Sequence, residues 1–174
     1  ILIWADRITR GWCRRTFLDY VLTRWAESEP QAALSYVQSL PNSEYRIKTY
    51  LNVLEVWLNN DKDAAATWVL GMPSGRLRRE ALRRVVDSMA IDDPARAFGL
   101  AKELNGIDVT YQMHSIFSEW AKTAVTTAAA TATELSAGRA RCEAITAVAS
   151  VWAETDLKGA LAWVRSLPPG EGKR

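Results

Sequence analysis

The unit that decides the fold of this chain reads WLNNDKDAAATWVLGMPSGRLRREALRRVVDS and occupies residues 57–88. Its first residue belongs to a series of bulky apolar positions at steps of 32, 32, 31 and 32 residues: Trp25, Trp57, Met89, Trp120 and Trp152. An alanine stands eight residues after each of them (Ala33, Ala65, Ala97, Ala128 and Ala160), and a Gly or Ser stands fourteen before (Gly11, Ser43, Gly75, Gly106 and Gly138). A fixed period of this length is typical of a tandem-repeat protein.

Each unit carries the start and stop signals of a first helix. Asp93-Pro94 combines an N-cap carboxylate with a proline at the first helical position, where its fixed φ suits the helix. Glu29-Pro30 repeats this pair, and Asp61 and Asp156 keep the cap without the proline. The helix is expected to run for about a dozen residues. It should end at a Leu-Pro or Met-Pro pair, because proline disfavours helical geometry in the residue before it. The terminating prolines are Pro41, Pro73 and Pro168.

A second helix is predicted to end near each bulky position. Its apolar residues stand seven, four and three places earlier: Tyr50, Val53 and Leu54; Leu82, Val85 and Val86; Met113, Ile116 and Phe117; Ile145, Val148 and Ala149. This spacing places them on one stripe of an α-helix. No useful length of chain alternates with period two, so we expect no β-sheet.

The sequence therefore predicts an all-α fold, a right-handed α-solenoid of about five helix-turn-helix repeats of about 32 residues. We expect one array over residues 1–174, with partial units at 1–25 and 153–174 and whole units at 26–57, 58–89, 90–120 and 121–152. Because the chain begins and stops inside a unit, we expect it to be either a segment of a longer array or an array with a frayed end.

The recurring residues have packing interpretations. The alanines are expected where two helices approach closely, and the tryptophans as anchors between layers, although an aromatic binding stripe is an alternative. Arginines stand eleven residues before four of the expected bulky positions, at Arg14, Arg46, Arg78 and Arg141. We predict that each donates hydrogen bonds to the last carbonyls of a neighbouring helix. The rival interpretation is a row of arginines directed at phosphates or carboxylates of a partner.

One unit departs from the pattern. Val109 stands at the arginine position, Ala124 replaces the acidic cap, and the run from Val125 to Thr133 is almost wholly Ala and Thr. Threonine is a mediocre helix former, and the run lacks large residues that lock layers together. We expect a looser layer or a bend there.

Composition excludes little and supports no catalytic site. The formal net charge of +2 is too small to draw the whole molecule onto a polyanion. No apolar run approaches the roughly 20 residues of a membrane-spanning helix. We expect Cys13 and Cys142 to be free and buried, and His114, the only histidine, to pack on the apolar side of its helix. No catalytic, metal or cofactor residues are predicted. The cytoplasm is the default compartment, with a targeting segment before Ile1 left open.

The unit with two helices, an alanine at their crossing and a proline near the turn resembles the tetratricopeptide-type α-solenoids, whose standard repeat has 34 residues. The resemblance extends from Trp4 to Gly170. The family places its Gly and Tyr elsewhere, and the Asp-Pro, Leu-Pro-x-Gly and terminal Trp pattern belongs to this chain. The resemblance implies a curved superhelix whose concave side, lined by the first helices, binds peptides or protein surfaces.

On that implication, the candidate contacts are exposed first-helix positions: Gln31, Ser35, Gln38, Asp63, Thr67, Arg96, Gly99 and Lys102. Trp12 lies outside the regular series and is a candidate for a contact outside the core. Arg76, Arg79 and Arg83 are spaced to share one helical face, which is either a solvated surface or a site for an acidic protein, lipid headgroups or nucleic acid.

The expected function is a non-catalytic protein–protein interaction scaffold, or an accessory or structural subunit of a larger assembly. Its protein or peptide partner would bind along the concave or edge surface. The main alternative is a helical-repeat binder of nucleic acid or other polyanions through the arginine groups. A third possibility is a fragment whose catalytic partner domain lies outside it.

Overall fold

The computed structural model describes residues 12–41, 43–104 and 107–167. These residues form nine α-helices and no strand, so the all-α prediction is confirmed. The chain divides into two compact units, Ile1–Ala81 and Leu82–Arg174, and helix α6 (Arg76–Asp92) runs across the division.

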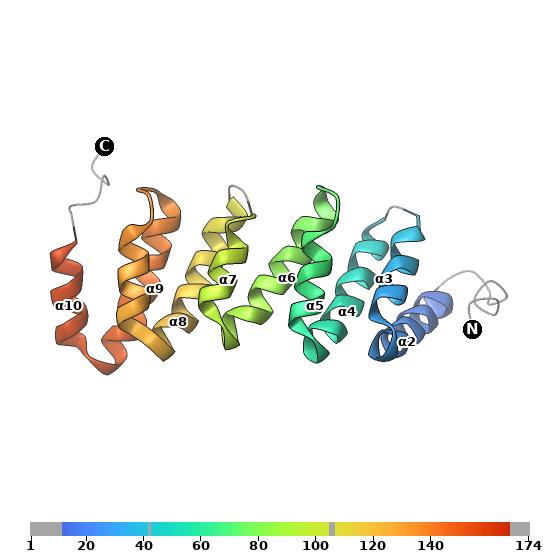
Figure 1. Ribbon diagram of the computed structural model, residues 1–174, viewed down its shortest axis with the longest axis horizontal. Coiled ribbons are helices and arrows are strands. Elements are labelled where there is room, and N and C mark those ends of the chain that lie inside the picture. Colours follow the sequence, from blue (N-terminus) through green and yellow to red (C-terminus); the bar gives the residue numbers. More distant parts are fainter. Residues whose placement is uncertain (1–11, 42, 105–106, 168–174) are drawn as a thin grey trace. The chain divides into compact units, whose positions relative to one another are not determined.

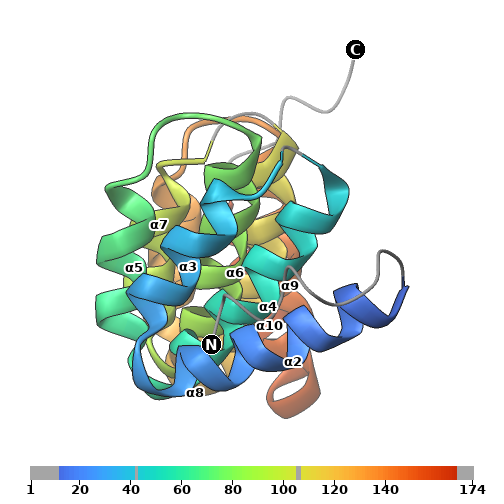
Figure 2. The same cartoon turned by 90° about the vertical axis from the view of Figure 1, so that its right-hand side faces the viewer.

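The first unit contains α2 (Trp12–Ser28), α3 (Pro30–Ser39), α4 (Glu44–Asn60) and α5 (Lys62–Leu70). Helix α3 packs against α4, and α2 packs against both of them (Figure 1). Helix α4 also packs against α5. Figure 2 shows α3 and α5 to the same side of α4. The two short first helices of this unit therefore share one layer, with the longer α4 in the other.

The second unit contains α7 (Pro94–Ala101), α8 (Ile107–Glu134), α9 (Arg139–Thr155) and α10 (Leu157–Ser166). Each helix packs against the next one along the chain. Neighbours in sequence are thus neighbours in space, as expected when short turns connect antiparallel helices.

The aspartates predicted as N-caps form the expected hydrogen bonds. The side chains of Asp61, Asp93 and Asp156 each accept from the backbone N–H three residues on, at 3.0, 3.0 and 2.9 Å. Glu29 also stands at an N-cap position, but its side chain makes no capping hydrogen bond. Its longer side chain instead reaches back to accept from the indole N–H of Trp25, at 3.1 Å. The carboxylate of Glu29 therefore binds an indole and does not cap the start of α3.

The break in helix α8 falls at Ala124, just before the run where a looser layer or a bend was expected. This residue interrupts α8 with φ −149° and ψ 68°, close to the dihedral angles of the capping residues Asp61 (−151°, 91°) and Asp93 (−139°, 76°). The backbone therefore keeps the geometry of an N-cap at the expected position, although alanine has no side-chain acceptor. Ala128, Ala129 and Ala132 in the following stretch are nevertheless buried.

The recurring residues form the core. All five alanines eight residues after the bulky positions are at most 3% exposed, as close helix packing requires. Trp57, Met89 and Trp120 are buried, whereas Trp25 and Trp152 are half-buried. Trp57, Met89 and Trp120 are therefore core residues, as expected, whereas Trp25 and Trp152 are covered only in part.

A ring contact recurs at the junctions between long and short helices. Three of the tryptophans contact an aromatic residue eleven positions later, on the next helix. The pairs are Trp25–Tyr36, Trp57–Trp68 and Trp152–Trp163, with ring centroids 6.3, 5.9 and 5.8 Å apart. Such tilted contacts add to the free energy gained by burying the rings. Each pair joins the end of a long helix to the middle of the following short one.

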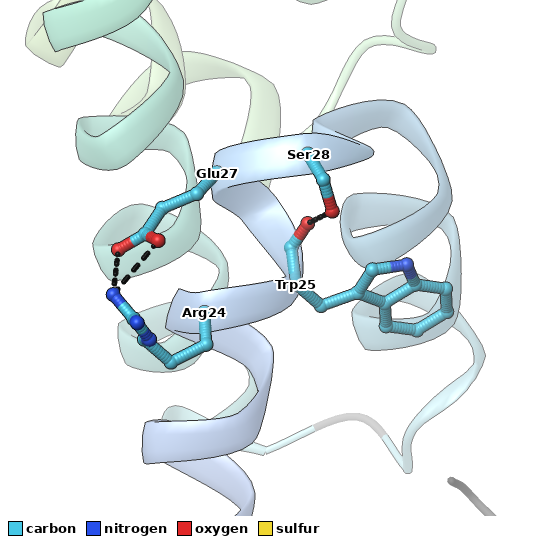
Figure 3. Close-up of polar contacts among 4 residues, drawn as sticks. All are labelled: Arg24, Trp25, Glu27 and Ser28. Carbon is cyan, nitrogen blue, oxygen red and sulfur yellow. Dashed lines mark hydrogen bonds and ion pairs between the residues drawn. The ribbon is translucent and has the colours of Figure 1, made fainter.

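At the end of α2, an exposed ion pair and the aromatic ring of Trp25 lie on different sides of the helix. Arg24 and Glu27 pair at 2.9 Å, and the Ser28 hydroxyl donates to the Trp25 carbonyl at 3.2 Å. Figure 3 shows the Trp25 indole directed away from the ion pair. Because both charged side chains are exposed, their pairing contributes little to stability. The half-buried indole and the fully buried Ala26 pack this end of the helix.

Candidate functional site

A groove of about 510 Å³ lies between the first helices α3 and α5 of the first unit. Its lining residues are Gln31, Gln38, Ala64, Thr67, Trp68, Gly71, Met72 and Pro73. We call this the first-helix groove. Three of the residues predicted as partner contacts, Gln31, Gln38 and Thr67, are brought together here. Apolar lining with a few polar groups is the usual composition of a binding pocket.

Hydrogen bonds beneath the groove fix its apolar wall. The indole N–H of Trp68 donates a hydrogen bond to the hydroxyl oxygen of Tyr50 at 3.1 Å. The same hydroxyl donates to the sulfur of Met72 at 3.2 Å. Tyr50 is fully buried, and this burial raises its pKa, an effect partly offset by hydrogen bonds with Trp68 and Gln38. Because the hydroxyl holds both neighbours, the wall formed by Trp68 and Met72 is preorganised.

A second groove of about 540 Å³ adjoins the first, since both are lined by Gln38, Met72 and Pro73. We call it the arginine groove. Its other lining residues come from the start of α4 and from the turn into α6: Ser43, Glu44, Arg46, Ile47, Ser74, Gly75, Arg76, Leu77 and Arg78. Three arginines and one glutamate line it, so its charge is positive.

The contacts of Arg46 and Arg76 give these two arginines different roles. The Nη1 atom of Arg46 donates to the carbonyls of Gln38 and Leu40 at 3.5 and 3.3 Å. The prediction that this series of arginines caps a neighbouring helix is thereby confirmed at Arg46, which satisfies the end of α3. The Nη1 atom of Arg76 lies 2.5 Å from Oε1 of Glu44, with both side chains exposed. Arg46 is therefore a fixed part of the wall, whereas Arg76 is held only by a screened surface pair.

The remaining first-helix candidates do not line these grooves. Ser35 and Asp63 are exposed on α3 and α5, and the Ser35 hydroxyl donates to the Gln31 carbonyl at 2.8 Å. Arg96, Gly99 and Lys102 are exposed in the second unit, where the Lys102 ammonium lies 4.6 Å from the ring centroid of Phe98.

The other predicted contacts fall in different places. Arg79 is exposed on α6, and Arg83 is half-buried in the second unit, where its carbonyl accepts from Nε2 of Gln112 at 3.4 Å. Trp12 begins α2, but its side chain lies outside the described residues. Three arginines were predicted to share one helical face, and of these only Arg76 lines the arginine groove.

Two expectations about reactive side chains are wrong. Cys142 is free but exposed, because it occupies the repeat position of the exposed Arg79. The Cys13 side chain lies outside the described residues. His114 is also exposed, with Nδ1 3.8 Å from the carboxylate of Glu143, because one residue of helix rotates it away from the buried Met113.

Within residues 12–41, 43–104 and 107–167, no group of three or more His, Cys, Asp or Glu side chains is placed to hold a metal ion. None of the helices in these ranges has the length and apolar character needed to cross a membrane. No family model, curated protein or solved structure matches this chain.

Proposed function

We propose that this chain is a non-catalytic protein-interaction scaffold, or an accessory subunit of a larger assembly, that binds its partner in the first-helix groove. The observation that carries this proposal is the convergence of Gln31, Gln38 and Thr67 on a groove walled by Trp68 and Met72. A rigid apolar wall can take a bulky side chain of a peptide, and the amides and hydroxyl can bind the peptide backbone.

The finer fold belongs to the same proposal. The helices would stack as a right-handed α-solenoid that resembles the tetratricopeptide type. Its support is local recurrence: the buried alanines, the capping aspartates and the ring contacts eleven residues apart. Small-angle X-ray scattering tests it. A solenoid should give a radius of gyration clearly above the roughly 16 Å expected for a compact domain of this length, whereas a value near 16 Å contradicts it.

Peptide display tests the binding proposal directly. A library of random peptides is selected on the wild-type chain, and the enriched peptides are measured against Thr67→Trp and Thr146→Trp. Both threonines are exposed on helices, but only Thr67 lines the groove. A bulky neutral side chain at position 67 should fill the groove and weaken binding at least about tenfold, because a blocked central contact is costly.

The control variant should bind the selected peptides as the wild type does. Circular dichroism of both variants checks that their helical content is unchanged. If Thr67→Trp binds every enriched peptide as tightly as Thr146→Trp, the first-helix groove is not the binding site.

The three arginines of the adjoining groove favour a second candidate function, the binding of nucleic acid or another polyanion. Salt dependence tests this second candidate. Affinity for a single-stranded oligonucleotide should fall steeply with salt if phosphates are the ligand, because counterions are released on binding. An oligonucleotide affinity that changes little with salt would contradict phosphate recognition in the arginine groove.

A further inference from the structure

We propose that the partner of the first-helix groove is an acidic peptide, whose carboxylates bind in the arginine groove while an apolar side chain packs on Trp68 and Met72. This inference rests on the proposed function. Because the two grooves share Gln38, Met72 and Pro73, one extended segment can occupy both. The inference adds the chemistry of the partner to the place where it binds.

The sign of the partner's charge follows from the lining of the arginine groove. Arg46, Arg76 and Arg78 face it with Glu44 as the only acidic lining residue. Ser43 and Gly75 also line it, so the N-termini of α4 and α6 open there. Backbone N–H groups at a helix N-terminus add partial positive charge. The guanidinium groups and the two helix N-termini together favour carboxylates in the partner and disfavour lysine or arginine.

The first-helix groove favours a peptide over a nucleic acid. Single-stranded nucleic acids bind through successive aromatic platforms on which bases stack. Among the residues lining the two grooves, Trp68 is the only aromatic one, and the Tyr50 hydroxyl holds its indole by a hydrogen bond. A single apolar wall beside a positive groove fits one bulky residue with acidic residues a short distance away along the chain.

The ion pair of Glu44 predicts the direction in which a charge-removing substitution changes peptide affinity. In the free protein, Oε1 of Glu44 lies 2.5 Å from Nη1 of Arg76 and forms an ion pair with it. An incoming carboxylate must compete with this internal one, because both would bind the same guanidinium. Removing the charge of Glu44 should therefore strengthen binding of an acidic peptide, an effect that a purely structural role of Glu44 would not produce.

Fluorescence anisotropy with peptides from the display selection tests the inference. Each acidic peptide is compared with a version in which every Asp and Glu is replaced by Asn and Gln, and the amide version should bind about tenfold more weakly. Arg78→Gln and Arg76→Gln should each weaken the acidic peptide about three- to tenfold, and Glu44→Gln should tighten it about threefold. Arg79→Gln is the matched control, since Arg79 is exposed on the same helix and does not line the groove.

The outcomes separate the two proposals. If groove-dependent peptides prove neutral or basic, or if Glu44→Gln weakens the acidic ones, the acidic-partner inference is overturned while the groove remains a binding site. If Thr67→Trp has no effect, the proposed function itself fails. An oligonucleotide that displaces the acidic peptide and loses its own affinity in Arg78→Gln would overturn the peptide assignment in favour of nucleic acid.

Discussion

Replacing Ala124 by aspartate should stabilise the protein, which is unusual for a substitution in the interior of a long helix. Ala124 has the backbone geometry of an N-cap, with φ −149° and ψ 68°. At the equivalent positions Asp61 and Asp156, a carboxylate accepts from the backbone N–H three residues later, at 3.0 and 2.9 Å. At Ala124 the corresponding donor is the N–H of Thr127, which an aspartate side chain could reach.

The magnitude follows from two contributions. A capping side chain in place of alanine is worth about 0.5–2 kcal/mol. A negative charge at a helix N-terminus adds about 0.3–1 kcal/mol. Ala124 is half-buried, unlike the exposed Asp61 and Asp156, so desolvation of the carboxylate offsets part of this gain. We therefore expect about 1 kcal/mol of added stability, and a rise in Tm of about 2–4 °C.

Urea denaturation followed by circular dichroism measures the change in the free energy of unfolding. Ala124→Asn separates the hydrogen bond from the charge, because asparagine caps without a negative charge. Ala130→Asp is the control, since Ala130 is exposed within the same helix and aspartate there only lowers helix propensity. Equal or lower stability of Ala124→Asp relative to Ala130→Asp would refute the reasoning.

Three further predictions concern the core and are checked by denaturation. Ala65→Leu should cost about 1–3 kcal/mol by overpacking, whereas the same change at exposed Ala130 should cost little. Trp57→Ala should cost about 3–5 kcal/mol, and Trp152→Ala less because it is half-buried; equal costs would contradict this. Burial raises the pKa of Tyr50, so its contribution to stability is complete below the ordinary tyrosine pKa of about 10 and is lost as pH rises through the folded value. Tyr50→Phe should remove this alkaline loss, and a pH profile unchanged from the wild type would contradict the assignment.

The features that the sequence predicted well are those set by local chemistry. Asp61, Asp93 and Asp156 cap helices because a short carboxylate reaches only its own helix start. The alanines are buried because they lie on the inward face of their own helices, as Ala33 does with Val37 in α3. Glu29 departs from the pattern, since one more methylene group lets its carboxylate reach the Trp25 indole.

The features that the sequence did not predict depend on distances between helices. Residue types on α3 and α5 cannot reveal how far apart the helices lie, so the volume of the groove and the omission of Ser35 from its lining emerged only from the structure. The ring contacts could have been predicted from the sequence, because an aromatic residue stands eleven residues after three of the recurring tryptophans. These residues are Tyr36, Trp68 and Trp163. The exposure of His114 shows that a buried neighbour in sequence says little about the next residue of a helix.

Two-dimensional NMR of the tryptophan indole N–H groups, during titration with a selected acidic peptide, tests the central claim most directly. Trp68 lines the first-helix groove, and Trp163 occupies the same repeat position in α10 of the other unit. We predict that the Trp68 resonance shifts in a saturable manner while the Trp163 resonance stays in place. A saturable shift of Trp163 with Trp68 unchanged would contradict the account.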